Sequence, residues 1–195
     1  MKLRESEMPE EAYWETLFDV GLILDRLGVN DRLGNVVEMG CGYGTFTIPV
    51  ARRISGVLTT FDIDDAMIER TRQRAAVAEA WNVLYILGDV FADGFGGEVG
   101  NKDACLLFNI LHGEKPVCLL AEAARVVRPG GGVLVIHWRC DPATPRGPSM
   151  KIRPRPEQIA GWAKETGLLA ADGPVIELPP WHYGLRLRRG EDYEM

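Results

Sequence analysis

The chain has 195 residues, 46% of them hydrophobic, which is enough apolar material for one domain with a substantial core over residues 1–195. Its formal net charge of −6 opposes a chain-wide attraction to nucleic acid, so nucleic acid is disfavoured as a partner. No apolar run approaches the roughly eighteen residues of a membrane span, and no apolar segment follows the charged start, so we expect a cytoplasmic protein. The widely spaced cysteines predict neither a metal site nor a disulfide framework, and the sequence does not set the oligomeric state.

Strand-like and helix-like segments alternate along the chain after a first amphipathic helix. Predicted helices cover residues 10–28, 45–54, 65–81, 114–127 and 157–166. Predicted strands cover residues 35–39, 57–63, 83–87, 104–108 and 133–138, part of 168–178, and 183–188. Prolines interrupt every regular pattern between residues 139 and 156, which predicts a long loop. The alternation indicates an α/β fold with a mostly parallel sheet and ligand sites outside the carboxyl ends of its strands.

Three glycines at alternate positions follow the first predicted strand, in the run Val36-Val37-Glu38-Met39-Gly40-Cys41-Gly42-Tyr43-Gly44. Because glycine lacks a Cβ atom, such a loop turns sharply and brings its N–H groups against a ligand. Thr45 stands where the third glycine of the dinucleotide fingerprint G-x-G-x-x-G falls, which weakens the case for a pyrophosphate ligand. Glu38 would repel phosphate but accept a hydrogen bond from an ammonium group, which suits an adenosine ligand without phosphates. A plain strand-to-helix turn is the alternative.

Further polar residues follow the ends of the other predicted strands. Asp62 lies about twenty residues after Gly40, where a carboxylate accepts both ribose hydroxyls of an adenine nucleoside. Asp89 follows the third strand and either binds an exocyclic amino group or is a turn residue. Because Asn109 and Arg139 follow the next two strands, one rim of the sheet is expected to collect all of these side chains.

Five short motifs in this order resemble those of the class I S-adenosylmethionine-dependent methyltransferases. They are Val36 to Gly44, Phe61-Asp62-Ile63, Gly88-Asp89, Phe108-Asn109-Ile110-Leu111-His112 and Val127-Arg128-Pro129-Gly130-Gly131. The resemblance covers about residues 35 to 138, and within the superfamily the chain looks most like the small single-domain type related to ubiquinone/menaquinone biosynthesis. It implies a three-layer, doubly wound, Rossmann-like sheet of seven strands, mostly parallel, with an antiparallel last strand.

The same resemblance implies a cofactor site for S-adenosylmethionine, with S-adenosylhomocysteine as the product. Glu38 and Gly40 would lie near the methionine moiety, and Asp62 would hold the ribose. The other implied cofactor residues are Cys41, Gly42 and Gly44 in the loop, Asp89 and Val90 at the adenine, Ile63 and Met67 on the faces of the adenine ring, and Phe108 and Asn109 beside the sulfonium. Ile63 and Met67 are equally explained as core residues.

Methyl transfer mainly requires positioning and exclusion of water, and a general base is needed only if the acceptor loses a proton. His112 follows the fourth strand and is the candidate base or acceptor contact. The loop at residues 139–156 carries five basic residues against one aspartate and is expected to overhang the acceptor side, which makes Arg139 and Arg146 candidate contacts for a carboxylate or phosphate. A solvated loop is the alternative. Residues 1–30 are expected to form an N-terminal helix acting as a lid. Tyr13 and Trp14 either belong to this lid, with Tyr13 on the acceptor side, or are core aromatics.

We therefore predict an S-adenosylmethionine-dependent methyltransferase acting on a small-molecule acceptor, for which the basic loop suggests an anion. A nicotinamide-dependent oxidoreductase is an alternative that Thr45 and the Gly88-Asp89 motif disfavour. A non-catalytic protein that binds S-adenosylmethionine is a second alternative, which the sequence leaves open. Nucleobase acceptors are disfavoured because Asn109-Ile110-Leu111 lacks the Asn/Asp-Pro-Pro-aromatic motif and no Pro-Cys nucleophile is present.

Overall fold

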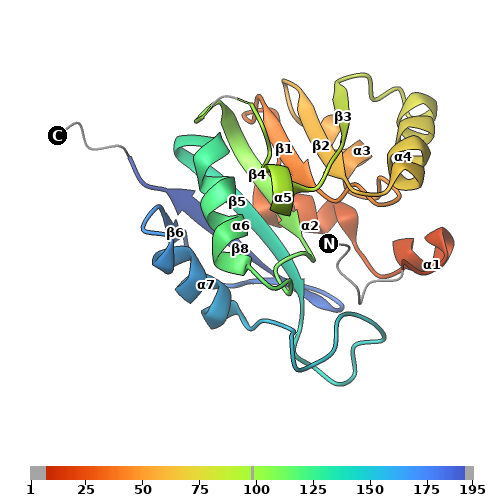
Figure 1. Cartoon of the computed structure of the whole chain (residues 1–195). Helices are drawn as coiled ribbons and strands as arrows, with labels where there is room; N and C mark the ends of the chain where they lie inside the picture. Colours follow the sequence, from red (N-terminus) through yellow and green to blue (C-terminus); the bar gives the residue numbers. More distant parts are fainter. Residues whose placement is uncertain (1–7, 98, 192–195) are drawn as a thin grey trace.

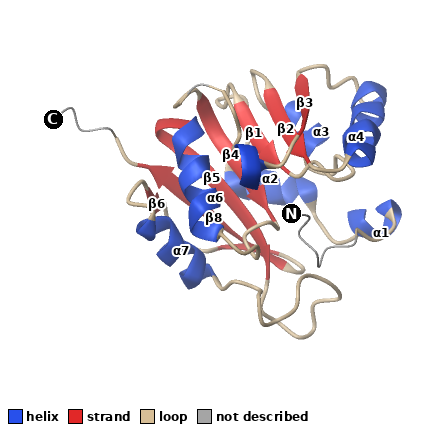
Figure 2. Cartoon of the chain, in the orientation of Figure 1, coloured by secondary structure: helices blue, strands red, loops and turns tan. Residues whose placement is uncertain are grey.

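A mostly parallel sheet with helices on both faces organises the chain (Figures 1 and 2). The computed structural model describes residues 8–97 and 99–191, so residues 1–7 of the predicted N-terminal lid lie outside the described residues. The strands are β1 (Val36–Met39), β2 (Leu58–Asp62), β3 (Val83–Leu87), β4 (Lys102–Phe108), β5 (Val127–Trp138), β6 (Leu169–Ala171), β7 (Ile176–Leu178) and β8 (His182–Arg189). The helices are α1 (Glu11–Glu15), α2 (Val20–Leu27), α3 (Thr47–Ala51), α4 (Asp65–Val77), α5 (Val90–Asp93), α6 (Pro116–Val126) and α7 (Pro156–Glu165).

The strand order in the sheet is β3-β2-β1-β4-β5-β8-β6, and β7 pairs with β8. The first five strands of this order are parallel, and β8 is antiparallel to β5, as expected. The sheet has eight strands rather than the predicted seven, because the sixth strand is divided in two. Both β6 and β7 pair with β8, one near Leu187 and the other near His182. Between them stands Pro174, which has no N–H to donate to a strand ladder.

Each face of the sheet buries its own apolar cluster, which gives three layers. The cluster on one face contains residues of α2, α3 and α4, among them Leu24 and Val50. The cluster on the other face contains residues of α5, α6 and α7, among them Leu120 and Ile159. The central strand β1 is buried throughout, and β4 is buried and apolar from Ala104 to Phe108, as expected for a sheet covered on both faces.

The predicted helix at residues 10–28 is in fact two helices, α1 and α2. The break falls at residues 16–19, where the Asp19 carboxylate accepts the Leu22 N–H at 3.0 Å and caps α2. Leu17 and Phe18 lie in the break and are buried. Because two apolar side chains in a connecting turn continue the helical spacing, the pattern alone did not reveal the interruption.

The connection between α6 and β5 is also shorter than predicted. The chain passes from Val126 directly into β5, so the strand begins within the predicted helix-ending segment rather than at residue 133. Gly131 permits this, because a Cβ atom there would lie 2.8 Å from the Asp103 carbonyl oxygen of the neighbouring strand β4.

Register brings the carboxyl ends of the parallel strands together. Met39 at the end of β1 pairs with Phe61 on one side and Leu107 on the other. The loops that follow these strands therefore emerge side by side at the carboxyl ends of the strands (Figure 1). Among the described residues, none of the helices combines the length and the apolar character needed to cross a membrane.

At the amino ends of the strands, Gly56, which precedes β2, packs directly on the backbone of Gly34, which precedes β1. A Cβ atom at Gly56 would lie 2.5 Å from the Gly34 carbonyl carbon, so Gly56→Ala forces two backbone segments apart. We expect this substitution to lower the free energy of unfolding by about 1–3 kcal/mol. The control is Gly161→Ala in α7, where a Cβ meets nothing within 4 Å and alanine favours the helix, so stability should rise by about 0.5–1 kcal/mol. Urea unfolding of the two variants checks both signs, and equal effects would contradict the packing argument.

Candidate functional site

A cleft of about 1270 Å³ lies at the carboxyl ends of the parallel strands. Of the twelve predicted cofactor residues, the structure brings eleven to its walls: Glu38, Gly40, Cys41, Gly42, Asp62, Ile63, Met67, Asp89, Val90, Phe108 and Asn109. His112 and Arg146 line it as well. Gly44, Tyr13 and Arg139 are not part of the cleft wall.

The glycine loop turns between β1 and α3 with positive φ at Gly40 (83°), Gly42 (51°) and Gly44 (77°). Gly40 and Gly42 face the cleft, whereas Gly44 faces α4, where a Cβ atom would lie 2.9 Å from Thr71 Cγ2. Gly44 therefore permits close packing of the loop on α4, and it does not line the cleft. The alternate spacing of the glycines did not separate these two roles.

Asp62 ends β2 with its carboxylate turned toward the glycine loop. Its Oδ2 atom accepts the Gly42 N–H at 3.0 Å, and the Cys41 thiol lies 3.6 Å from the same atom. Its Oδ1 atom accepts the Asp64 N–H at 3.0 Å. A carboxylate has about four lone-pair sites, so each oxygen retains acceptor capacity toward the cleft after these contacts.

Glu38 lies beneath the glycine loop and is 2% exposed. The hydroxyl groups of Thr47 and Thr60 both donate to its Oε2 atom, at 2.7 and 2.8 Å, and so link β1 to α3 and to β2. Burial raises the pKa of the Glu38 carboxyl to about 7, against the opposing effect of the two hydroxyl groups. Glu38 is thus a buried polar support of the loop as well as a residue of the cleft wall.

Asp89 and Asn109, which follow β3 and β4, both line the cleft. Asp89 accepts the Phe91 N–H at 2.9 Å and so caps α5. It therefore has the turn role that was one of its two expected roles, in addition to its place in the cleft wall. Asn109 has a φ of 58°, which is uncommon for a residue with a side chain. Its buried Oδ1 atom has no hydrogen-bond partner among the described residues. Such an atom at a cleft wall suits a polar ligand.

The residues expected on the acceptor side divide into those at the cleft and those away from it. Arg146 lines the cleft, and no ion pair of its guanidinium is found within residues 8–97 and 99–191. Arg139 instead forms an ion pair with Glu177 of β7 and donates through Nε to the His182 carbonyl oxygen at 3.1 Å. The placement expected for Arg139 is thus corrected, because a carboxylate outside the loop, at Glu177, holds its side chain away from the cleft.

Arg153 organises the loop from residue 139 to 155 from within. It is 7% exposed, and its guanidinium donates to the carbonyl oxygens of Arg139, Arg146 and Pro148 at 2.7, 3.2 and 2.9 Å. These acceptors are neutral, so burial lowers the pKa of Arg153 relative to its usual value. The side chain holds Arg146, Gly147 and Pro148 as one turn of the cleft wall.

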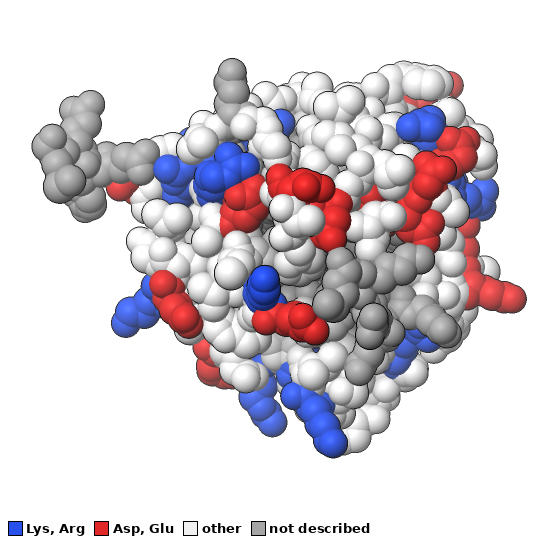
Figure 3. Space-filling view, in the orientation of Figure 1, with Lys and Arg blue, Asp and Glu red and all other residues white. Residues whose placement is uncertain are grey.

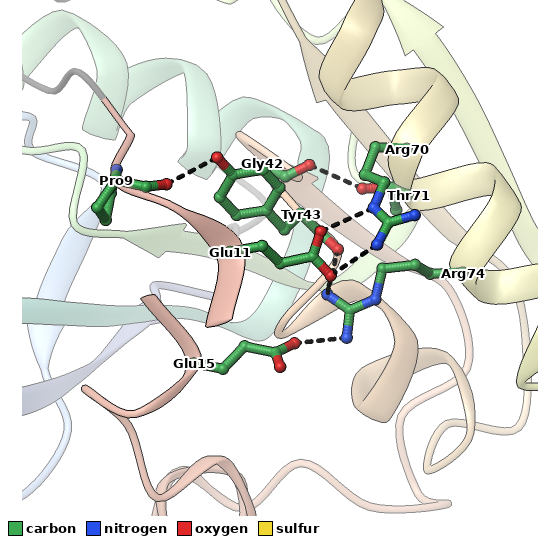
Figure 4. Close-up of polar contacts among 8 residues, drawn as sticks. All are labelled: Pro9, Glu11, Glu15, Gly42, Tyr43, Arg70, Thr71 and Arg74. Atoms are coloured by element: carbon green, nitrogen blue, oxygen red, sulfur yellow. Dashed lines mark hydrogen bonds and ion pairs between the residues drawn. The ribbon is translucent and has the colours of Figure 1, made fainter. Parts of the chain in front are cut away.

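The N-terminal segment is tied to α4 and the glycine loop by polar contacts (Figure 4). Glu11 accepts from Arg70 Nε at 2.7 Å, and Arg74 contacts Glu11 at 3.1 Å and Glu15 at 2.5 Å. The Tyr43 hydroxyl donates to the Pro9 carbonyl oxygen at 2.7 Å. Hydrogen bonding from Arg70 holds the pKa of Glu11 below its usual value.

This arrangement brings Trp14 to the cleft and leaves Tyr13 outside it. Tyr13 is 44% exposed, so the structure supports neither explanation given for it, as an acceptor contact or as a core aromatic. Trp14 packs edge-on against Phe18 and Trp138, at ring centroid distances of 4.8 and 6.4 Å. Trp14 is one of the apolar residues at helical spacing in the predicted helix, whereas Tyr13 lies outside that apolar series.

Trp14, expected with Tyr13 either in a lid over the cofactor or in the core, lines the cleft. Other residues of the cleft wall were not predicted as site residues from the sequence. They are Met8, Met39, Tyr43, Thr45, Phe46, Phe61, Asp64, Gly88, Phe91, Ile110, Trp138, Gly147 and Pro148. Most of them adjoin a motif residue in the chain, and that adjacency was the available signal. Met8, Gly147 and Pro148 come from the N-terminal segment and the long loop, whose paths no motif fixes.

Charge is distributed unevenly along the cleft. Its acidic residues, Glu38, Asp62, Asp64 and Asp89, follow or belong to β1, β2 and β3, whereas His112 and Arg146 follow β4 and β5. The face of the molecule in Figure 3 carries both signs in separate groups, so its described residues do not form one basic area of the kind that binds nucleic acid. Within the described residues, no group of three or more His, Cys, Asp or Glu side chains is placed to hold a metal ion.

The burial of Glu38 makes stability depend on pH. Because its pKa is raised from 4.5 to about 7 in the folded protein, its contribution is most favourable below pH 4.5 and is lost as the pH rises through 7. Relative to Glu38→Gln, the wild type should lose stability on the order of 3 kcal/mol across this interval. Urea unfolding of both proteins from pH 4.5 to 8 measures the difference. Parallel curves would show that Glu38 is ionised in the folded state throughout.

A family model described as "Methyltransferase domain" matches residues 36–131. Among curated proteins, an uncharacterized 37.1 kDa protein in transposon TN4556 of Streptomyces fradiae is 31% identical over 121 residues. That match covers 60% of this chain, and the chain spans about a third (34%) of the relative's length.

Solved structures share the fold. A SAM-dependent methyltransferase from Aquifex aeolicus superposes with a TM-score of 0.79 at 17% identity, over 92% of this chain and 94% of that one. The N-methyltransferase NodS from Bradyrhizobium japonicum, in complex with S-adenosylhomocysteine, superposes with a TM-score of 0.72 at 16% identity, over 94% of each chain. An O-methyltransferase family protein from Burkholderia thailandensis gives 0.70 at 21% identity, over 90% of this chain and 56% of that one.

The sheet order, the glycine loop braced by Asp62 and the family match agree with one another and with the motifs of the sequence. Residues 36–131 therefore match the family described as "Methyltransferase domain", and the chain has the fold of S-adenosylmethionine-dependent methyltransferases.

Proposed function

We propose that this chain transfers a methyl group from S-adenosylmethionine to a small anionic acceptor, with residues 1–195 acting as one domain in the cytoplasm. The observation that carries the proposal is the cleft itself. Its acidic residues lie around the glycine loop, and its basic residues lie on the side of the long loop. The four cysteines are free thiols, which fits a reducing compartment.

The glycine-loop end of the cleft fits the cofactor. Asp62 is fixed by the Gly42 and Asp64 N–H groups and retains acceptor capacity for the two ribose hydroxyls. The backbone at Gly40 and Gly42 leaves room that a Cβ atom would reduce, since such an atom would lie 3.4 Å from Ile110 and 3.3 Å from Met8. When bound, S-adenosylmethionine supplies an electrophilic methyl group on a positively charged sulfur, which the surrounding carboxylates favour.

The opposite end fits an acceptor with an apolar body and a negative group. Phe46, Phe108, Trp14 and Trp138 form an aromatic wall, in which Phe46 and Phe108 meet edge-on with centroids 5.0 Å apart. Arg146 offers a guanidinium fork that pairs well with carboxylate or phosphate. His112 lies on the same side and would contact the acceptor or take its proton.

Two segments would exclude water from the reaction. Residues 8–15 reach the cleft through Met8 and Trp14 and are held by α4. The loop from residue 139 to 156 reaches it through Arg146, Gly147 and Pro148. Both would restrict how the acceptor approaches the methyl group, which is the protein's main contribution to this kind of displacement.

Removing the ribose ligand tests the cofactor site. Asp62→Ala should weaken binding of S-adenosylhomocysteine by about 1–3 kcal/mol, or roughly 5- to 150-fold, because ribose hydroxyls are left unpaired in the cleft. Isothermal titration calorimetry gives the dissociation constants. Asp65→Ala is the control, since Asp65 lies in the first turn of α4 and does not line the cleft. Equal affinity for both variants would remove Asp62 from the site.

A label-transfer experiment tests the activity and the charge of the acceptor. The protein is incubated with methyl-labelled S-adenosylmethionine and a cell extract of small molecules, which is then separated by ion exchange. We expect label in the anionic fraction, its loss when S-adenosylhomocysteine is added in excess, and at least a tenfold lower yield with Arg146→Ala at limiting acceptor, from the lost charge-assisted contact. Lys151→Ala removes an exposed cation from the same loop, outside the cleft, and should leave the yield unchanged.

The result separates the alternatives. Label in a neutral or cationic fraction would overturn the anionic acceptor while keeping the methyl transfer. Tight cofactor binding without label in any fraction would favour a non-catalytic binding protein.

A further inference from the structure

Two histidines meet where β4 and β5 end. His112 lies in the loop after β4 and lines the cleft, whereas His137 is the next-to-last residue of β5 and is fully buried. Nδ1 of His112 lies 3.4 Å from Nε2 of His137. The two rings meet edge-on, with centroids 5.5 Å apart and an interplanar angle of 75°.

A backbone carbonyl sets the direction of this contact. Nδ1 of His137 lies 3.4 Å from the Trp138 carbonyl oxygen, which can only accept a hydrogen bond, so Nδ1 carries the hydrogen. Burial lowers the pKa of His137 to about 3, so the ring is neutral near pH 7 and has a single N–H. Its Nε2 atom is therefore an acceptor, and the hydrogen between the two rings belongs to His112 Nδ1.

We propose that His137 is a positioning residue, which holds neutral His112 as the Nδ1–H tautomer and leaves the lone pair on His112 Nε2. Histidine in water prefers the opposite tautomer, with the hydrogen on Nε2, so this arrangement reverses the default. The tautomer follows from the contacts and the burial of His137, whereas its use in catalysis rests on the proposed methyl transfer. His112 would act as the base, and His137 would orient it.

The surroundings make His137 a poor proton acceptor. Beyond burial, neighbouring His112, His182 of β8 and Arg153 of the long loop all disfavour a positive charge on its ring. The Tyr183 ring of β8 lies 6.3 Å away, and its hydroxyl donates to the Pro154 carbonyl oxygen. Arg146 lines the same cleft. A proton taken by His112 therefore remains there instead of passing inward.

For an acceptor with a hydroxyl group, the step balances as follows. The hydroxyl proton passes to His112 Nε2, and the oxygen electron pair forms the bond to the methyl carbon. The carbon–sulfur electron pair stays on sulfur, and the imidazolium then returns its proton to water. A carboxylate acceptor needs no such base, so the pH dependence of turnover also reports on which atom is methylated.

Nitrogen-15 NMR of the imidazole rings tests the tautomer without cofactor or acceptor. The chain has only three histidines, so tag-free labelled protein gives a simple long-range proton–nitrogen spectrum, assigned with His112→Asn and His182→Asn. At a pH where His112 is neutral, we expect its Nδ1 to be protonated and its Nε2 to be of the unprotonated type. In His137→Phe, which keeps a ring but removes its nitrogens, His112 should shift to the Nε2–H form.

His137→Gln provides the matched variant. Its carbonyl can accept from His112 Nδ1 and its amide can donate to the Trp138 carbonyl, so the wild-type tautomer should return. An Nε2–H tautomer of His112 in the wild type, or an unchanged tautomer in a folded His137→Phe protein, would overturn the proposal. If His137→Phe does not fold, the wild-type spectrum and that of His137→Gln decide it.

Turnover adds a readout that a purely structural role would not move. With a hydroxyl acceptor in hand, His137→Phe should lower kcat at pH 7 by about 10- to 100-fold with little change in acceptor KM, and His137→Gln should restore most of it. Loss of stability alone would lower the active fraction without changing the shape of the pH profile. The NMR result stands even if no methyl transfer is found, so failure of this inference and failure of the proposed function are distinguishable.

Discussion

The site depends on one constraint, which is that neighbouring parallel strands end in register. Because Met39, Phe61 and Leu107 lie abreast, the loops after β1, β2 and β4 start from the same level of the sheet. The Asp62 carboxylate then needs only to reach across one strand spacing to accept the Gly42 N–H. Beneath the loop, Glu38 of β1 likewise accepts the hydroxyl groups of Thr47 in α3 and Thr60 in β2. The shape of the cofactor loop is thus set by polar groups that bridge adjacent elements.

The polarity of the cleft is a second consequence of the strand order. Acidic side chains follow the strands on one side of β1, and His112 and Arg146 follow those on the other side. A cationic cofactor and an anionic acceptor would each be attracted to a different end, and the two would meet near Phe108 and Asn109. The buried cation Arg153 adds to the positive end while being bound only to neutral oxygens. This organisation supports the proposed acceptor class.

Much of the fold and of the cleft lining could be predicted because local chemistry determines them. Apolar runs such as residues 104–108 become strands in any sheet covered on both faces, and Asp62 must follow its strand to reach a neighbouring loop. Arg139 and Gly44 do not line the cleft, because contacts with segments distant in the sequence fix their positions. Arg139 is held by Glu177, and Gly44 is fixed by Thr71 of α4. Neither partner stands in a motif, so no local pattern could reveal the pairing.

The ion pairs that hold the N-terminal segment also have a consequence for release of product. On this side the cleft is bordered by a segment held by the packing of Trp14, by the hydrogen bond from Tyr43 to Pro9 and by partly exposed ion pairs, with Glu11 and Arg70 at 24% and 47% side-chain exposure. The ion pairs weaken as ionic strength rises, whereas the packing of Trp14 and the apolar layers on either side of the sheet do not. In the proposed reaction, salt would therefore loosen only the charged contacts of this segment, and the spent cofactor would leave more readily while the fold is kept.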